Sequence, residues 1–150
     1  MFQKGYFENS LTIIGSGLNE LTTDEFGEKV KNAIQNNIEN PKEISAFLKR
    51  LFFKQQDANS KDSYQKFLEM SLELDDKFDL KENRLFYLAM SPKFFGVATN
   101  HLKESGLTNV KGLMRIFIEK PFGDDFKSAK KLNNQIRKSF KKKYLELITI

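Results

Sequence analysis

The first third of the chain alternates a short apolar run with a helical repeat. Residues 11–14 are mostly apolar and Gly15 opens the loop behind them, which predicts a short buried strand. Thr22 and Glu25 have the spacing of a capping box that starts a helix. Apolar residues then recur every four positions and give this helix one apolar face: Phe26, Val30, Ile34 and Ile38. Residues 40–41, Asn-Pro, predict its stop.

The middle of the chain predicts a second long helix and a core strand. Residues 44–53 are ambiguous, because their period suits a helix at first and their last three residues, Leu-Phe-Phe, suit a strand. Ser60 is placed to cap the next helix. The apolar stripe of that helix is Tyr64, Phe67, Leu68, Leu72 and Phe78. Residues 84–90 are one arginine and six apolar residues, too few for a lone helix, and predict a core strand.

The last third continues the alternation. Ser91 and Pro92 are typical of a helix N-cap and first position, and Gly106 is typical of the left-handed residue that ends a helix. Residues 114–118 predict another core strand. Residues 124–142 predict a last helix with four inward residues: Phe126, Ala129, Ile136 and Phe140. Strands alternating with helices predict an α/β fold with a parallel sheet, in which ligands bind at the carboxyl ends of the strands.

The composition adds the class of protein. The 150 residues are 39% hydrophobic and 30% charged, which we expect of a single globular domain. The chain has no cysteine, so we expect no disulfide, no thiolate metal site and a reducing, cytoplasmic environment. No stretch approaches the roughly 20 apolar residues of a membrane helix, and the N-terminus lacks a signal-peptide pattern. We therefore expect no membrane association.

The net charge of +5 is unevenly placed. Eight cations and no acid lie between residues 127 and 143: Lys127, Lys130, Lys131, Arg137, Lys138, Lys141, Lys142 and Lys143. Such a run is typical of an anion-binding face for nucleic acid or phosphate, and equally of the solvated face of a surface helix. The run lies opposite an apolar stripe and lacks aromatic residues for base stacking. Both features favour the solvated face.

Three ordered blocks of sequence carry a family resemblance. Residues 84–107 read RLFYLAMSPKFFGVATNHLKESGL, residues 115–140 read RIFIEKPFGDDFKSAKKLNNQIRKSF, and residues 10–26 read SLTIIGSGLNELTTDEF. In this order and spacing they resemble the coenzyme-binding domain of glucose-6-phosphate dehydrogenase. The resemblance implies a partial Rossmann-like parallel sheet with flanking helices, whose first strand and glycine-rich turn lie before residue 1.

The resemblance also implies an activity and a set of site residues. Enzymes of this family oxidise glucose 6-phosphate to 6-phosphogluconolactone and pass the hydride to NADP or NAD, a step of the pentose phosphate pathway in carbohydrate metabolism. Lys120, at the end of the strand at 114–118, is implied to contact both substrate and coenzyme, and an ammonium group is a strong donor to sugar hydroxyls and phosphate. Pro121 and Gly123 shape the turn behind it. Four more coenzyme contacts are implied: Gly15, Ala89, Met90 and Pro92.

Two positions and one missing residue limit what can be carried over. Leu18 stands where the family usually has an arginine for the 2′-phosphate of NADP, and an aliphatic side chain cannot pair with a phosphate. His101, the only histidine, lies on the predicted helix after Pro92, where we expect it to be exposed and not a base. The family's general-base histidine lies beyond this region. No catalytic residue is therefore assigned, and we expect no turnover from these 150 residues alone.

The segment at 144–150 has two possible origins. One codon choice for Leu145 to Ile150, read one base earlier, spells Arg-Ile-Asp-His-Tyr, which is the next motif of the family. Our hypothesis is that this tail is frameshifted and the chain is a gene remnant; the alternative is a natural terminal strand. An incomplete sheet would also expose the edge of a strand, and we expect copies of the chain to associate through that edge.

Three functions therefore compete at this point. The first is a partial glucose-6-phosphate dehydrogenase that binds glucose 6-phosphate and NAD or NADP. The second is a non-catalytic remnant with no independent activity. The third, which we rank last, is a basic nucleic-acid-binding module that uses residues 127–143.

Overall fold

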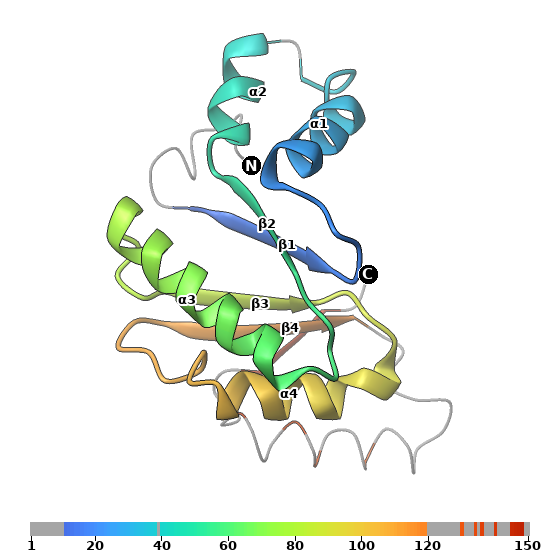
Figure 1. Cartoon of the computed structure of the whole chain (residues 1–150), viewed down its shortest axis with the longest axis vertical. Coiled ribbons are helices and arrows are strands. Elements are labelled where there is room, and N and C mark those ends of the chain that lie inside the picture. Colours follow the sequence, from blue (N-terminus) through green and yellow to red (C-terminus); the bar gives the residue numbers. More distant parts are fainter. Residues whose placement is uncertain are drawn as a thin grey trace. The chain divides into compact units, whose positions relative to one another are not determined.

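The computed structural model describes residues 11–38, 40–119, 130, 134, 136, 140 and 145–148. The chain divides into two compact units (Figure 1). The β1–β2 unit comprises residues 1–57 and 70–80, and the β3–β5 unit comprises residues 58–69 and 81–150. The strand pairs are parallel and alternate with helices, which confirms the predicted α/β class.

The β1–β2 unit pairs two strands in parallel. The strands β1 (Ile13–Gly17) and β2 (Leu51–Gln55) are in register from Ile13 opposite Leu51 to Gly17 opposite Gln55. Two helices, α1 (Thr23–Ile34) and α2 (Pro41–Leu48), lie beside this pair in Figure 1. The ambiguous stretch at 44–53 is thus helical first and then extended.

The start of α1 confirms the predicted capping box. The Thr22 hydroxyl accepts from the Glu25 N–H at 3.2 Å, and the Glu25 carboxylate accepts from the Thr22 N–H at 2.7 Å. The predicted stop at Asn40 was wrong, because α1 already ends at Ile34. The Asn40 side chain instead accepts from the Lys42 N–H at 3.0 Å and caps α2, with Pro41 in the first turn.

Gly15 lies inside β1 and does not open a loop, so that prediction was also wrong. The strand continues through this position because Gly15 pairs with Phe53 of β2, and its missing side chain leaves room for the Phe26 ring of α1. A Cβ at Gly15 would collide with the end of that ring. The strand is also less buried than predicted, since Ile13 is 36% exposed.

The β3–β5 unit has three parallel strands in the order β3–β4–β5. Its elements are the first half of α3 (Lys61–Phe78), β3 (Arg84–Leu88), the 3-10 turn η2 (Pro92–Phe94), α4 (Phe95–Glu104), β4 (Met114–Glu119) and β5 (Leu145–Ile148). The predicted helix end is confirmed, since Ser105 caps α4 and Gly106 follows with φ +89°. The predicted helix at 92 begins as the 3-10 turn.

One apolar core holds the β3–β5 unit together. Its members are Tyr64, Leu88, Phe95, Ala98, Leu102, Leu107, Met114, Ile116, Ile118, Ile136 and Phe140. On β4 the buried residues alternate along the strand, so a single face of the sheet meets α4, as Figure 1 shows. Ile136 and Phe140 are buried as predicted, whereas Phe126 and Ala129 lie outside the described residues.

Two predictions of burial in this region were wrong. In β3, Leu85 and Tyr87 are 61% and 47% exposed, because side chains alternate and only the face of Leu88 meets the core. In α3, Leu72 is 47% exposed, while Ser71 and Leu74 are buried. A stripe that begins at Tyr64 and advances 3.6 residues per turn reaches position 71, not 72.

A tight turn at residues 79–82 precedes β3 and is hydrogen-bonded to the segment that precedes β4. Lys81 and Glu82 have φ of 59° and 55°. The Glu82 carboxylate accepts from the Lys111 N–H at 3.1 Å, and the Asn83 side-chain oxygen accepts from the Leu113 N–H at 2.8 Å. Gly112 lies so close to this turn that a Cβ there would collide with the Lys81 carbonyl oxygen.

The segment at 145–148 forms the strand β5, paired with β4 from Ile116 opposite Leu145 to Glu119 opposite Ile148. A strand was what the natural-terminus alternative predicted. The frameshift hypothesis concerns the DNA and stays a prediction.

Candidate functional site

The carboxyl end of β1 is open in the β1–β2 unit. A Cβ at Gly17 would meet no atom within 4 Å, and Leu18 is 70% exposed. The next two residues, Asn19 and Glu20, are also exposed. In open α/β sheets, ligands bind outside the carboxyl ends of the strands. We therefore call residues 18–22 the β1 loop and treat it as the candidate ligand-facing segment.

The β1 loop is held in place from β2. The Gln55 side-chain amide donates from Nε2 to the Leu18 carbonyl oxygen at 3.0 Å. The backbone N–H of Gln56 donates to the Gly17 carbonyl oxygen at 2.8 Å and extends the ladder by one bond. The two bonds use the carbonyl groups of the last strand residue and the first loop residue, so the loop leaves the strand along a fixed path.

The other end of the β1 loop is fixed by the capping box. The Thr22 backbone N–H and then its hydroxyl donate to the Glu25 carboxylate and lower the pKa of that group, with a smaller contribution from Lys29. Thr23 adds a bond to β2, because its hydroxyl accepts from the Phe53 N–H at 3.2 Å. The start of α1 is therefore tied to the same strand as the start of the loop.

The two loop segments at this edge contain acids and no cation. The β1 loop contains Glu20, and the segment 55–60 behind β2 contains Asp57; neither segment contains a lysine or arginine. A phosphate monoester at this edge would meet acids and no cation from the two segments. A ribose hydroxyl, by contrast, can donate to an acid.

The structure places the predicted contacts of the other unit after β3. Ala89 is exposed, and Pro92 opens the 3-10 turn as a half-buried residue. Met90 is also half-buried and packs against the apolar core, which gives its side chain a structural contact as well. These three residues share one strand end, whereas Gly15 belongs to the other unit.

Lys120, Pro121 and Gly123 lie outside the described residues. The strand that leads to them is described: β4 ends at Glu119, directly before Lys120, and Ile118 within it is fully buried. The prediction that Lys120 follows a core strand is confirmed by this strand, while the roles of all three residues stay predictions.

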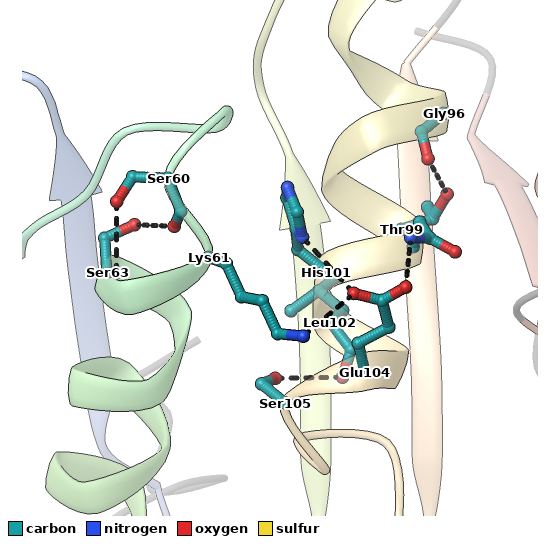
Figure 2. Close-up of polar contacts among 10 residues, drawn as sticks. Ser60, Lys61, Ser63, Gly96, Thr99, His101, Leu102, Glu104 and Ser105 are labelled. Atoms are coloured by element: carbon teal, nitrogen blue, oxygen red, sulfur yellow. Dashed lines mark hydrogen bonds and ion pairs between the residues drawn. The ribbon is translucent and has the colours of Figure 1, made fainter.

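The prediction that His101 is exposed was wrong. Its side chain is 15% exposed and its ring lies 5.3 Å from that of Tyr64. Figure 2 shows it on α4 beside Glu104, with Lys61 of α3 directed at the same carboxylate oxygen. The distances to Glu104 Oε2 are 3.9 Å from His101 Nδ1 and 3.6 Å from Lys61 Nζ. A hydrogen bond from the Asn100 amide, followed by the charge of Lys61, lowers the pKa of Glu104.

This polar group ties α3 to α4 within the β3–β5 unit and is not arranged for catalysis. The His101 Nδ1 atom is buried and accepts no hydrogen bond, so it offers no accessible base. The described residues also hold no cluster of three or more His, Asp or Glu side chains that could bind a metal ion. None of the helices described has the length and apolar character that a membrane crossing demands.

The profile of the family described as "Glucose-6-phosphate dehydrogenase, NAD binding domain" matches residues 1–146. The chain belongs to this family. The match supports the resemblance in the sequence and the Rossmann-like class of the fold, and it implies a nicotinamide coenzyme. The remnant and nucleic-acid alternatives are not favoured by it.

Relatives in the glucose-6-phosphate dehydrogenase family cover almost the whole chain. Glucose-6-phosphate 1-dehydrogenase of Leuconostoc mesenteroides is 33% identical over 140 residues, 93% of this chain and 29% of the relative. The Bacillus subtilis (strain 168) enzyme is 34% identical over 140 residues, 93% of this chain and 28% of the relative. The chain therefore spans less than a third of the length of these relatives.

Solved structures agree in fold. A glucose-6-phosphate dehydrogenase in complex with its substrate glucose 6-phosphate superposes with a TM-score of 0.87 at 29% identity, covering 98% of this chain and 31% of that one. The Mycobacterium avium glucose-6-phosphate 1-dehydrogenase gives a TM-score of 0.78 at 24% identity, covering 98% of this chain and 30% of that one. The second likeness concerns the fold alone.

Sequence reasoning did not find Gln55 and Thr23 as anchors of the β1 loop. Both residues are polar and follow or precede apolar runs, as residues in loops generally do. Their partners, Leu18 and Phe53, are 37 and 30 positions away along the chain, and only the parallel pairing of β1 with β2 brings them together.

Proposed function

We propose that this chain is the coenzyme-binding part of a glucose-6-phosphate dehydrogenase. The reaction is oxidation of glucose 6-phosphate to 6-phosphogluconolactone with hydride transfer to NAD or NADP. The observation that carries the proposal is the family match across residues 1–146, together with a parallel-stranded fold whose β1 end is open. The bound coenzyme supplies the nicotinamide ring that accepts the hydride.

The described residues fit a dinucleotide at the strand ends. Gly17 offers backbone without side-chain cover, and Leu18 offers an exposed apolar surface beside it. These two residues and Gly15 would hold the adenosine side of the coenzyme. Ala89, Met90 and Pro92, which follow β3 in the β3–β5 unit, are proposed as further coenzyme contacts.

The same edge favours NAD over NADP. The resemblance puts Leu18 where the family usually has an arginine for the 2′-phosphate, and neither the β1 loop nor the segment 55–60 supplies another cation. Glu20 and Asp57 would repel a phosphate and can accept from a ribose hydroxyl. We therefore propose that this chain prefers NAD to NADP.

A binding experiment tests the coenzyme proposal directly. The purified chain is titrated with NAD and with NADP in separate isothermal titrations. We expect NAD to bind more tightly than NADP, and Leu18→Arg to raise the affinity for NADP by about ten-fold, as one charged hydrogen bond allows. Leu113→Arg, at a leucine with a similar exposure of 69%, is the control and should leave both affinities unchanged.

Lys120 is proposed as the contact to glucose 6-phosphate and to the nicotinamide side of the coenzyme. It follows β4 directly, at the end of the sheet where ligands bind. Lys120→Ala should weaken glucose 6-phosphate binding about ten-fold or more, which phosphorus NMR of the ligand measures. Lys130→Ala removes the same charge at an exposed position and should have little effect.

Activity is the second readout. With glucose 6-phosphate and either coenzyme, we expect no increase in the absorbance of reduced nicotinamide, because abstraction of the hydroxyl proton needs a base and none is assigned among these residues. The Nδ1 atom of His101 is buried. Coenzyme binding without turnover would support the proposal that this chain is the coenzyme-binding part of the enzyme. Failure of NAD and NADP alike to bind would overturn the proposed function.

A further inference from the structure

The Gln55 side chain holds the start of the β1 loop. Gln55 is the last residue of β2 and lies opposite Gly17 in the register, so its side chain starts next to the point where β1 ends. From there its Nε2 reaches the Leu18 carbonyl oxygen at 3.0 Å. The bond joins a side chain of one strand to the first loop residue of its neighbour.

The geometry leaves the loop with one free section. On the strand side, Gln55 and Gln56 hold the carbonyl groups of Leu18 and Gly17. On the helix side, Thr22 is held by Glu25, and Thr23 by Phe53. Only the short section between these anchors is left unheld by the bonds described, and Asn19 and Glu20 within it are exposed.

We propose that Gln55 is a positioning residue for coenzyme binding, which acts through Leu18 and does not itself need to touch the coenzyme. The inference rests on the proposed function, because it assumes that the β1 loop faces the adenosine ribose. Fixing a loop in its bound conformation before the ligand arrives lowers the ordering cost of binding. Gln55 therefore contributes affinity by holding the Leu18 peptide in place.

The test compares two glutamine-to-methionine variants of the whole chain. Gln55→Met keeps the size and flexibility of the side chain and removes the amide donor. Gln65→Met makes the same change at an exposed position of α3 and is the matched control. Two measurements are made on each: NAD affinity by titration, and amide hydrogen exchange of residues 18–20 without ligand.

We expect Gln55→Met to bind NAD about two- to ten-fold more weakly, the range of one net hydrogen bond. The amides of residues 18–20 should also exchange faster in the free variant, which a glutamine that only touched the coenzyme would not cause. Gln65→Met should match the original chain in both measurements, and both variants should keep its thermal midpoint.

The inference fails if Gln55→Met binds NAD normally, or if its affinity falls while the loop amides exchange as before. The second result would make Gln55 a direct contact. If the unmodified chain binds neither coenzyme, the proposed function fails instead. In that case the exchange measurement still decides whether Gln55 holds the loop.

Discussion

The two units of the chain bury their side chains to different degrees. In the β1–β2 unit, neither α1 nor α2 contains a fully buried residue. In the β3–β5 unit, α4 alone buries Phe95, Ala98, Thr99 and Leu102. Because each fully buried large apolar side chain contributes about 1.5–3 kcal/mol, the stability of the molecule is concentrated in the β3–β5 unit.

Side-chain hydrogen bonds contribute more to the local geometry in the unit that buries less apolar surface. The candidate coenzyme edge of β1 belongs to the unit with little buried apolar surface, so its geometry depends on side-chain anchors such as Gln55 and Thr23. Segments that bind ligands are commonly drawn from the less stable parts of a fold. The β3–β5 unit, by contrast, is held by its core.

The largest predicted effect breaks the better-packed unit. Leu102→Ala should lower the free energy of unfolding by about 2–5 kcal/mol, because it leaves a cavity beneath α4 at a residue that is 4% exposed. Leu72→Ala is the matched change at a helical leucine that is 47% exposed, and should cost less than about 1 kcal/mol. Urea unfolding followed by circular dichroism measures both. Equal losses would remove the contrast between buried and exposed positions.

Two glycine-to-alanine substitutions, one in each unit, compare how closely the backbone of each unit is packed. Gly112→Ala should destabilise the β3–β5 unit by about 1–3 kcal/mol, because the new methyl group meets the backbone of Lys81 and Asn83, which cannot move aside cheaply. Gly17→Ala, in the β1–β2 unit, meets open space and should change stability by less than about 0.5 kcal/mol. Thermal melts of the two variants give the order; a reversed order would contradict the packing around Gly112.

The capping box gives a smaller effect confined to the β1–β2 unit. Thr22→Ala removes the acceptor of the Glu25 N–H and should destabilise α1 by about 1 kcal/mol. Amide hydrogen exchange of the first turn of α1 measures the change. Amides of Ile116 and Ile118 in β4 should exchange as before, since they belong to the other unit. A general increase in exchange would mean that the two units unfold together.

The smallest effect is a dependence on pH. The folded state lowers the pKa of Glu25, so the ionised carboxylate stabilises the fold above the unfolded pKa of about 4.3. This contribution is lost as the pH falls through the lower, folded value. Exchange at α1 should therefore rise on acidification, and Glu25→Gln should weaken the rise. An unchanged pH profile in that variant would remove Glu25 from the effect.

Local rules predicted most of the fold. The capping box of α1, the glycine after α4 and the strand at 114–118 depend on neighbours within a few residues, and the structure confirms each. The alternation of strands and helices then gave the α/β class without further information.

Predictions failed where a distant partner decides the outcome. Gly15 stays in its strand because it pairs with Phe53 of β2, and the Phe26 ring fills the space of its missing Cβ. His101 is covered because Tyr64 of another helix lies over it. The sequence placed the candidate site at strand ends, and the family resemblance pointed to Leu18; the anchor of the loop, Gln55, is found only once the strands are paired.

The bond between Thr23 and Phe53 has a consequence for strand addition. N–H groups along a strand alternate sides, and Gln56 donates toward β1, so the Phe53 N–H points to the outer edge of β2. The Thr23 hydroxyl occupies that donor. A further strand that tried to extend the pair beyond β2 would have to displace it, so the residue that begins α1 also blocks growth of the ladder from this side.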